Sequence, residues 1–121
     1  MSVERGRAGE ALAAAYLEGR GLRVLARNVR CRMGELDLVA RDGDCLVFVE
    51  VKERASLGHG DGLDAVTAAK RRRLVRTALW YAQREGLSEG AIRFDVVAIE
   101  RLADGSARLR HEPGAFDADG R

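Results

Sequence analysis

A group of acidic residues with one lysine is the first feature of this sequence that could do chemistry. Within residues 34–52, GELDLVARDGDCLVFVEVK, two strand-like runs flank Asp42-Gly43, a dipeptide typical of a two-residue hairpin turn. That turn sets Leu38 opposite Val47. Because side chains alternate along a strand, the hairpin has two distinct faces. One face carries Glu35, Asp37, Phe48, Glu50 and Lys52, and the other carries Leu36, Leu38, Val47, Val49 and Val51.

A divalent cation would explain why acids gather on an otherwise apolar hairpin. Like charges opposed on a sheet destabilise it, and a buried carboxylate carries a desolvation cost. Asp37 and Glu50 become diagonal neighbours, roughly 7 to 8 Å apart at the backbone, and two carboxylates can close that gap onto one hard cation. Lys52 could then position a water nucleophile. The alternative is a solvated face with a Glu50–Lys52 ion pair, which the apolar surroundings VFVEV disfavour.

Lysine is rare in this chain, which suggests specific roles for the two lysines present. Of 21 basic residues only Lys52 and Lys70 are lysines. A lysine offers a compact charge on a flexible stem, which the planar fork of an arginine does not. Lys70 lies on the core-facing stripe of a helix that we expect to run from Thr67, as N-cap, to about Arg84.

The start of that helix carries four consecutive basic residues, Lys70, Arg71, Arg72 and Arg73. Positive charge is unfavourable at a helix N-terminus, where free backbone donors bind anions instead. We therefore expect these four side chains to contact nucleic-acid phosphates. The alternative is a charged helix face that is simply exposed to solvent.

A further acid, Glu10, lies in an alanine- and leucine-rich helix expected over residues 4–18. Two roles are open for this side chain. An acid in the first turns of a helix interacts favourably with the helix dipole. The same carboxylate could instead be an additional ligand of the cation.

Length and composition describe one compact domain. A chain of 121 residues, 46% of them hydrophobic, buries a core without needing disulfides, and Cys31 and Cys45 show no metal-ligand spacing. We find neither a membrane-spanning segment nor a signal peptide, so we expect a cytoplasmic protein with no membrane partner. The net charge is only +2, so nucleic-acid binding must depend on local clusters such as residues 70–73.

The remaining runs complete the order of elements. They are a strand over residues 22–29, a glycine-containing loop over 54–62 with His59, a buried strand over 91–100, and an edge strand over 107–111. A helix between two strands of one sheet predicts a parallel crossover. We interpret Asp95 as a structural hydrogen-bonding acid. Residues 1–112 are expected to form the domain, and residues 113–121 a flexible tail.

Taken together, these elements resemble a known fold. The order helix, three antiparallel strands, helix, then one or two strands, with an acid in the second strand and ExK in the third, is similar to the PD-(D/E)XK restriction-endonuclease-like nucleases. More closely, the chain resembles the uncharacterised bacterial YraN family. The motifs that carry this resemblance are RAGE (7–10), RN (27–28), GELDLV (34–39), FVEVK (48–52), VT (66–67) with Lys70, and RFDVV (93–97). As a set they are specific, whereas ExK alone is weak.

The resemblance implies a catalytic role for five residues. Asp37 and Glu50 would be metal carboxylates, with Glu10 as the acid that the Holliday-junction-resolvase-like branch carries in its first helix. Lys52 would be the signature lysine and Lys70 the basic residue of the second helix. The implied cofactor is Mg²⁺ or Mn²⁺, and the implied substrate is DNA, in a branched or otherwise structured form.

Three functions of different classes are consistent with this sequence. The first is a metal-dependent nuclease that hydrolyses phosphodiester bonds in DNA. The second is a non-catalytic nucleic-acid-binding or adaptor module of the same fold. A third is a protein-interaction domain whose acids form only a salt-bridge network. The complete set Asp37, Glu50 and Lys52 favours the nuclease, because a protein that only binds has no need of all three.

A second apolar stripe on the 67–84 helix bears on quaternary structure. It comprises Ala68, Val75, Leu79 and Ala82, and it makes the apolar surface too broad for a helix with one wet face. A homodimer would cover this stripe. Other parts of the same chain would also do so.

Overall fold

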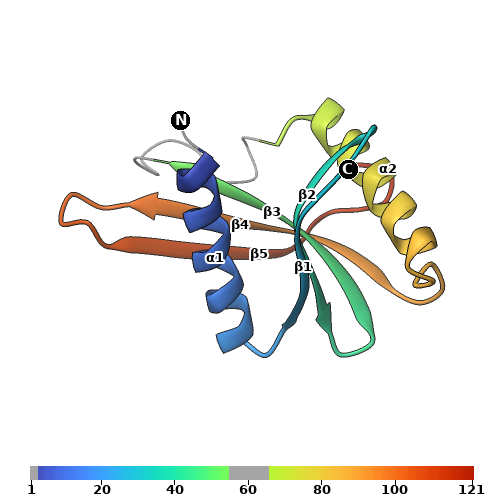
Figure 1. The fold of residues 1–121 in the computed structure, drawn as a ribbon, viewed down its shortest axis with the longest axis horizontal. Coiled ribbons are helices and arrows are strands. Elements are labelled where there is room, and N and C mark those ends of the chain that lie inside the picture. Colours follow the sequence, from blue (N-terminus) through green and yellow to red (C-terminus); the bar gives the residue numbers. More distant parts are fainter. Residues whose placement is uncertain (1–2, 55–65) are drawn as a thin grey trace.

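The chain folds in the element order that the sequence predicted. The computed structural model describes residues 3–54 and 66–121, so His59 and most of its expected loop lie outside the described residues. Within these ranges the elements are, in chain order, α1 (Val3–Gly19), β1 (Arg23–Cys31), β2 (Gly34–Asp42), β3 (Cys45–Arg54), α2 (Ala68–Arg84), β4 (Ile92–Arg101) and β5 (Ala107–Phe116) (Figure 1). This order, around one mixed sheet flanked by helices, confirms the predicted α/β class and element order.

Both helices begin and end where local signals place them. α1 confirms the helix expected over residues 4–18, and it ends shortly before Gly21, whose φ of 95° suits a glycine. α2 follows Thr67, whose hydroxyl accepts the Lys70 N–H at 3.2 Å, as predicted for the N-cap. In the described ranges no helix is long and apolar enough to cross a membrane.

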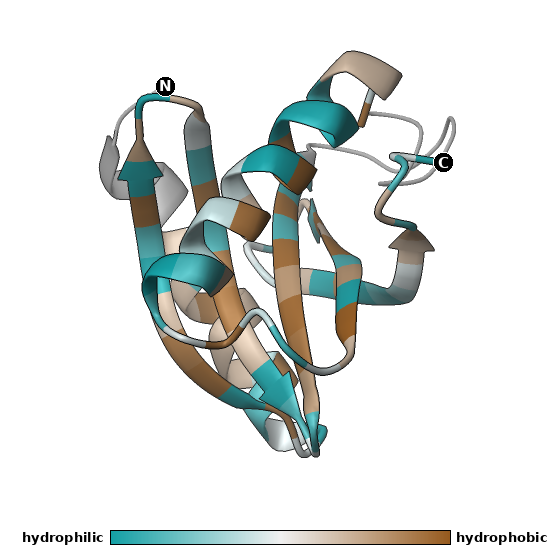
Figure 2. Ribbon diagram, turned by 90° about the vertical axis from the view of Figure 1, so that its right-hand side faces the viewer, coloured by the Kyte–Doolittle hydropathy of each residue, from teal (hydrophilic) through white to brown (hydrophobic). Residues whose placement is uncertain are grey.

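The strands form one sheet in the order β1-β2-β3-β4-β5. β1, β2 and β3 are antiparallel, β3 and β4 are parallel because α2 crosses between them, and β4 and β5 are antiparallel. α1 packs on one face of the sheet and α2 on the other (Figure 1). Each helix packs on its own hydrophobic core, here called the α1 layer and the α2 layer. Along β3, Val47 and Val49 are buried in the α1 layer and Phe48 in the α2 layer. The strands therefore show the apolar bands of Figure 2.

The turn between β2 and β3 is Gly43-Asp44 rather than the predicted Asp42-Gly43. Gly43 has a φ of 60°, and among the described non-glycine residues only Asn28 has a positive φ. Asp42 therefore does not adopt the positive φ that a type I′ turn beginning at that residue requires. A turn with glycine at its first central position and positive φ there is type II′.

This turn shifts the hairpin register by two residues from the predicted one. Leu38 pairs with Val49 rather than with Val47. The shift is even, so every side chain of β3 remains on its predicted face. Those that share the face toward α2 are Phe48, Glu50 and Lys52.

One residue of β2 departs from the predicted faces. Leu38 lies in the α1 layer as expected, but Leu36 packs in the α2 layer. β2 therefore turns about Asp37, and the β1–β2 ribbon runs on toward α2 (Figure 1). Strict alternation assumes an evenly twisted strand, and β2 changes direction where it leaves the middle of the sheet.

The second apolar stripe of α2 is covered in part by its own chain. Val75 and Ala82 are buried, whereas Ala68 is exposed and Leu79 is 48% exposed. The buried residues of the stripe therefore do not require a partner. The homodimer stays a prediction, which sedimentation equilibrium at high protein concentration tests.

β5 is longer than the edge strand expected over residues 107–111. It continues to Phe116, so the domain boundary expected at residue 112 falls inside a strand. Phe116 is buried and stacks on Phe94, with 5.1 Å between the ring centroids. This contact orders the first residues of the segment that we expected to be a flexible tail.

Candidate metal centre

The candidate site lies where β2 separates from β3. Backbone pairing between the two strands extends from their turn as far as Leu38 and Val49. Beyond this point the N–H of Val51 donates to Oδ2 of Asp37 at 2.9 Å. A side-chain acceptor thus replaces a strand carbonyl and satisfies the N–H where the strands part.

Three carboxylates meet at this opening. One oxygen each from Glu10 of α1 and from Glu35 and Asp37 of β2 lie within 4.8 Å of one another. Glu10 is 8% exposed, and its Oε1 is buried with no hydrogen-bond partner among the described residues. A buried carboxylate oxygen without a partner is costly. A hard cation, which prefers oxygen ligands, would remove that cost.

The position of Glu10 along α1 supports the ligand role over the dipole role. α1 begins at Val3, so Glu10 lies about two turns into the helix, beyond the first turn in which the dipole acts. Burial raises the pKa of Glu10, and hydrogen bonding from Asn28 partly offsets this rise. Asn28, with a φ of 54°, is a residue that the sequence analysis gave no role; asparagine tolerates this left-handed backbone better than most residues.

Burial and a neighbouring carboxylate favour the protonated form of Asp37. Burial is the larger cause, the charge of Glu50 is the next, and the hydrogen bond from Val51 acts in the opposite direction. Together they raise the pKa of Asp37 to about 8. A cation beside this carboxylate would favour its ionised form instead.

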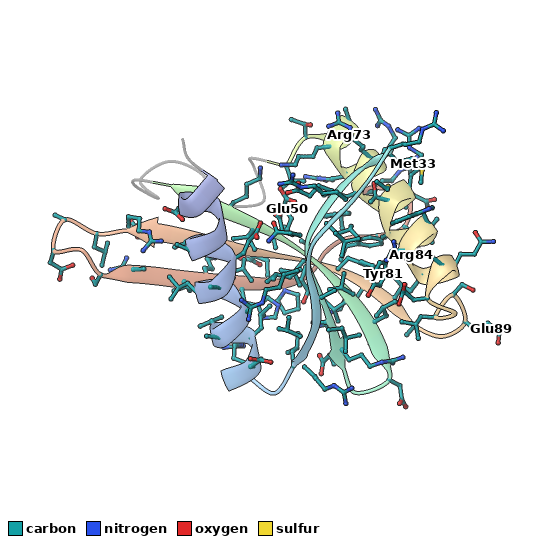
Figure 3. All side chains as sticks on the ribbon, in the orientation of Figure 1. Met33, Glu50, Arg73, Tyr81, Arg84 and Glu89 are labelled. Carbon is teal, nitrogen blue, oxygen red and sulfur yellow. The ribbon has the colours of Figure 1, made fainter. Side chains whose placement is uncertain are left out.

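Both lysines of the chain contact the same carboxylate. The Nζ atoms of Lys52 and Lys70 lie 3.2 and 2.5 Å from Oε2 of Glu50, which is 6% exposed. Burial lowers the pKa of Lys52, and the adjacent Lys70 lowers it further. Burial acts to lower the pKa of Lys70 as well, but its hydrogen bonds outweigh this and raise it. Figure 3 places Glu50 between the two helices.

The metal set implied by the resemblance was Asp37, Glu50 and Glu10. The structure brings Asp37 and Glu10 together, and it adds Glu35 as the third carboxylate of the closest group. Glu50 adjoins this group through Asp37, whose pKa it raises. Glu35 was left without a role in the sequence analysis, although it shares the predicted face of Asp37.

A pocket of about 450 Å³ opens onto these carboxylates between the β1–β2 ribbon and α2. It is lined by Arg30, Cys31, Gly34, Glu35, Asp37, Glu50, Lys70, Arg73, Leu74 and Thr77. Arg30, near the end of β1, is a further basic residue of this pocket. Its Nε lies 2.6 Å from the Glu35 carboxylate, so a basic and an acidic side chain are paired at the pocket wall.

The four basic residues at the start of α2 do not act as one set. Lys70 turns inward to the carboxylates. Arg71 donates to a backbone carbonyl at 2.9 Å, and its guanidinium lies 5.8 Å from the centre of the Phe116 ring. Arg72 and Arg73 are exposed and have no ion-pair partner among the described residues. Of the four basic residues, Arg72 and Arg73 are thus the two that are exposed.

Asp95 lies outside this site and has the structural role that we expected. It is 1% exposed, and it accepts hydrogen bonds from Arg93 at 2.8 Å and from the N–H of Gly114 at 3.0 Å. Nε2 of His111 lies 2.7 Å from its other oxygen. This network joins β4 to β5.

The fold and the site together define a class of protein. The elements run in the order α-β-β-β-α-β-β around a mixed sheet, with carboxylates and two lysines where its strands part, which makes the protein an α/β domain with a candidate metal centre. The chain belongs to the uncharacterised protein family UPF0102, whose model matches residues 9–99. This finding confirms the resemblance to the YraN family.

Relatives of similar length share about half of the sequence. A UPF0102 protein of Anaeromyxobacter dehalogenans is 54% identical over 116 residues, which cover 96% of this chain and 86% of the relative. One of Symbiobacterium thermophilum is 51% identical over 118 residues, 98% of this chain and 100% of the relative. Among solved structures, the chain is similar to Pyrococcus furiosus SfsA in complex with Ca²⁺. The identity is 18% and the TM-score 0.42, over 90% of this chain and 62% of that chain.

Proposed function

We propose that this protein is a metal-dependent nuclease that hydrolyses phosphodiester bonds in DNA. One observation carries the proposal: Oε1 of Glu10, buried in a group of three carboxylates, has no hydrogen-bond partner among the described residues, and the adjacent Glu50 carboxylate contacts both lysines. A purely structural network would pair that oxygen. A buried acidic oxygen without a partner, close to other acids, is typical of a functional site rather than of a stabilising one.

The donor set fits a hard divalent cation. Carboxylate oxygens are the ligands that Mg²⁺ and Mn²⁺ prefer, and Glu10, Glu35 and Asp37 each offer one within 4.8 Å of the others. Glu50 is the fourth carboxylate within reach, next to Asp37. When bound, such an ion polarises a phosphoryl oxygen and lowers the pKa of bound water.

The chain's own basic residues have separate parts in this proposal. Lys52 lies beside Glu50 and orients the attacking water or balances the charge that develops on the phosphate. Lys70, from the opposite element, holds the Glu50 carboxylate in place. Arg73, at the pocket wall with no described ion-pair partner, binds a phosphate of the substrate.

Cleavage assays with matched variants test the proposal. Purified protein is incubated with duplex, single-stranded and four-way-junction DNA in Mg²⁺, Mn²⁺ or EDTA. We expect cleavage of at least one substrate that depends on the metal, and loss of that cleavage in Asp37→Asn and Glu10→Gln. Calorimetry should show weaker Mg²⁺ binding in both variants, because each loses a charged ligand. Glu89→Gln is the control, because Glu89 is exposed in the segment that follows α2.

One observation favours the alternative of a non-catalytic nucleic-acid-binding module. Oε2 of Glu50 is already shared by Lys52 and Lys70, as in an ion-pair network that stabilises a fold. In that case the wild type binds DNA but cuts none of the substrates with either metal, and Glu50→Gln lowers thermal stability without changing DNA affinity. Metal-dependent cleavage would exclude this alternative.

A further inference from the structure

Part of the pocket has, apart from Arg73, no place in the roles assigned above. The charged residues of the metal centre form one side of it. The other side, between the end of the β1–β2 ribbon and α2, is lined by Arg30, Cys31, Gly34, Arg73, Leu74 and Thr77. With a volume of about 450 Å³ the whole pocket lies within the range of sites that hold small organic groups.

The wall of this pocket is preformed by close contact between the ribbon and α2. A Cβ built on Gly34 would lie 2.9 Å from Oγ1 of Thr77 and 3.5 Å from Cγ of Arg73. The Thr77 hydroxyl donates to the carbonyl of Arg73 at 2.9 Å, so its orientation is fixed. Thr77 is itself fully buried. The pocket therefore keeps its shape without needing a ligand to order it.

The lining suits a group that is both flat and anionic. Leu74 and Cys31 provide a mostly apolar surface. Arg73 lines the same pocket, and Arg30 brings a second guanidinium group, whose Nε is paired with Glu35. Guanidinium groups bind phosphate oxygens, and their planes stack on bases. A nucleotide unit, with a base and a phosphate on either side of its sugar, matches this arrangement.

The buried position of the carboxylates decides which form of nucleic acid can enter. Glu10 and Glu50 are 8% and 6% exposed, and the pocket opens onto Glu35, Asp37 and Glu50. The Glu35 side chain is 39% exposed, but a phosphodiester must enter the pocket to approach Asp37 and Glu50 as well. A double helix is too wide to do so, whereas a single strand, or a nucleotide displaced from a stack, can enter.

We propose that this pocket holds one unpaired nucleotide next to the phosphate that is cleaved. The proposal rests on the nuclease function above and names its substrate class, DNA with unpaired nucleotides such as single strands, ends and branch points. The Thr77 hydroxyl, a group that could otherwise read a base edge, is committed to the backbone. Binding should therefore be tolerant of base identity, as expected where bases are held by contact rather than by hydrogen bonds.

The two free cysteines allow a test in the unmodified protein. Cys31 lines the pocket, while Cys45 lies at the start of β3, and both are half-buried. Iodoacetamide should alkylate both in the free protein. A short single-stranded DNA in Ca²⁺ buffer, at ten times its Kd, should slow alkylation of Cys31 about tenfold by occupancy alone. Alkylation of Cys45, followed in the same samples by peptide mass spectrometry, should not change.

A duplex of the same sequence provides the matched ligand control. It should bind through exposed arginines without slowing the alkylation of Cys31. Equal protection by the duplex would overturn the preference for an unpaired nucleotide. Binding of the single strand without any protection of Cys31 would overturn the pocket assignment.

A substitution that fills the pocket gives an independent test. Cys31→Phe should weaken single-strand binding by about tenfold, the loss of roughly one base contact, and leave duplex binding unchanged; Cys45→Ser should change neither. Thermal unfolding verifies that both variants fold. Unchanged single-strand affinity in folded Cys31→Phe would contradict the proposal. A wild type that protects Cys31 but never cleaves would contradict the nuclease function and leave the nucleotide site standing.

Discussion

The main-chain N–H of Val51 on β3 donates to the Asp37 carboxylate on β2 at 2.9 Å. This hydrogen bond takes the place of a backbone hydrogen bond where β2 and β3 separate. It holds β2, which carries Asp37, near β3 while the two strands stay apart. Glu10 from one face of the sheet and Lys70 from the other can then approach the same place. The predictions below follow from this arrangement.

Added Mg²⁺ should stabilise the protein more at pH 9 than at pH 6. The pKa of Asp37 is raised from 3.8 to about 8, so the metal-free folded state binds more protons than the unfolded state between these values. Its stability therefore falls as pH rises through that window, by up to about 1.4 kcal/mol per pH unit for one group. Glu10, Glu35 and Glu50 face the same carboxylate, and the cation offsets their repulsion.

Melting temperatures in EDTA and in Mg²⁺, measured from pH 6 to 9, check this prediction. Asp37→Asn is the matched variant, because it keeps the shape of the side chain but cannot ionise. It should show a smaller and less pH-dependent effect of Mg²⁺. A shift of equal size at every pH in the wild type would contradict the prediction.

Lys52→Ala should remove cleavage and leave DNA affinity nearly intact. Lys52 contacts Glu50 inside the site rather than the exposed basic surface, so its loss should affect the transition state more than binding. Single-turnover rates and fluorescence anisotropy measure the two quantities. A variant that cuts as fast as the wild type would exclude the catalytic assignment of Lys52.

Gly34→Ala should destabilise the protein by about 1 to 3 kcal/mol, the usual cost of overpacking. The new Cβ would lie 2.9 Å from the buried Thr77 hydroxyl, so the β1–β2 ribbon must move away from α2. Gly19→Ala is the control, because a Cβ there meets no atom within 4 Å. Urea unfolding of the two variants measures the difference, and equal stabilities would show that the ribbon is not packed as described.

Arg71→Ala and Arg72→Ala should have different effects. Arg71 contacts the Phe116 ring and a backbone carbonyl, so its loss should cost about 1 to 2 kcal/mol of stability. Exposed Arg72 should affect stability little. Its loss should weaken DNA binding similarly for all sequences and reduce the salt slope by about one. Salt titrations of DNA binding and urea unfolding are measured on both variants. A loss of stability in Arg72→Ala together with a reduced salt slope in Arg71→Ala would contradict the prediction.

Asp95→Ala should be the most destabilising of these changes, at about 3 to 5 kcal/mol, because Arg93, the N–H of Gly114 and the buried side chain of His111 each lose a hydrogen-bond partner. Arg93 keeps its second partner, Asp42. Glu89→Ala, at an exposed position, should stay within about 0.5 kcal/mol of the wild type. Chemical unfolding compares the two. A loss below about 1 kcal/mol for Asp95→Ala would mean that the network contributes little to holding β5.

Local patterns determined most of the elements. The Thr67 cap, the alanine-rich first helix and the alternation in β3 depend on neighbours within a few residues, so sequence alone placed α1, α2 and the common face of Glu50 and Lys52. The rarity of lysine also identified a site, because both lysines converge on one carboxylate. The side chains of β3 lie on their predicted faces although the predicted register was wrong, because the register error was an even number of residues.

Only the tertiary structure decided how these elements meet. The register depended on a type II′ turn at Gly43 rather than type I′, a choice of backbone conformation that both glycine-containing dipeptides allow. The change of face at Leu36 depended on the packing of the β1–β2 ribbon against α2, and it brought Glu35 to Glu10. Contacts between residues distant in the sequence also made Arg71 structural rather than free. Such contacts leave no local pattern, because their free energy arises only when separate elements pack together.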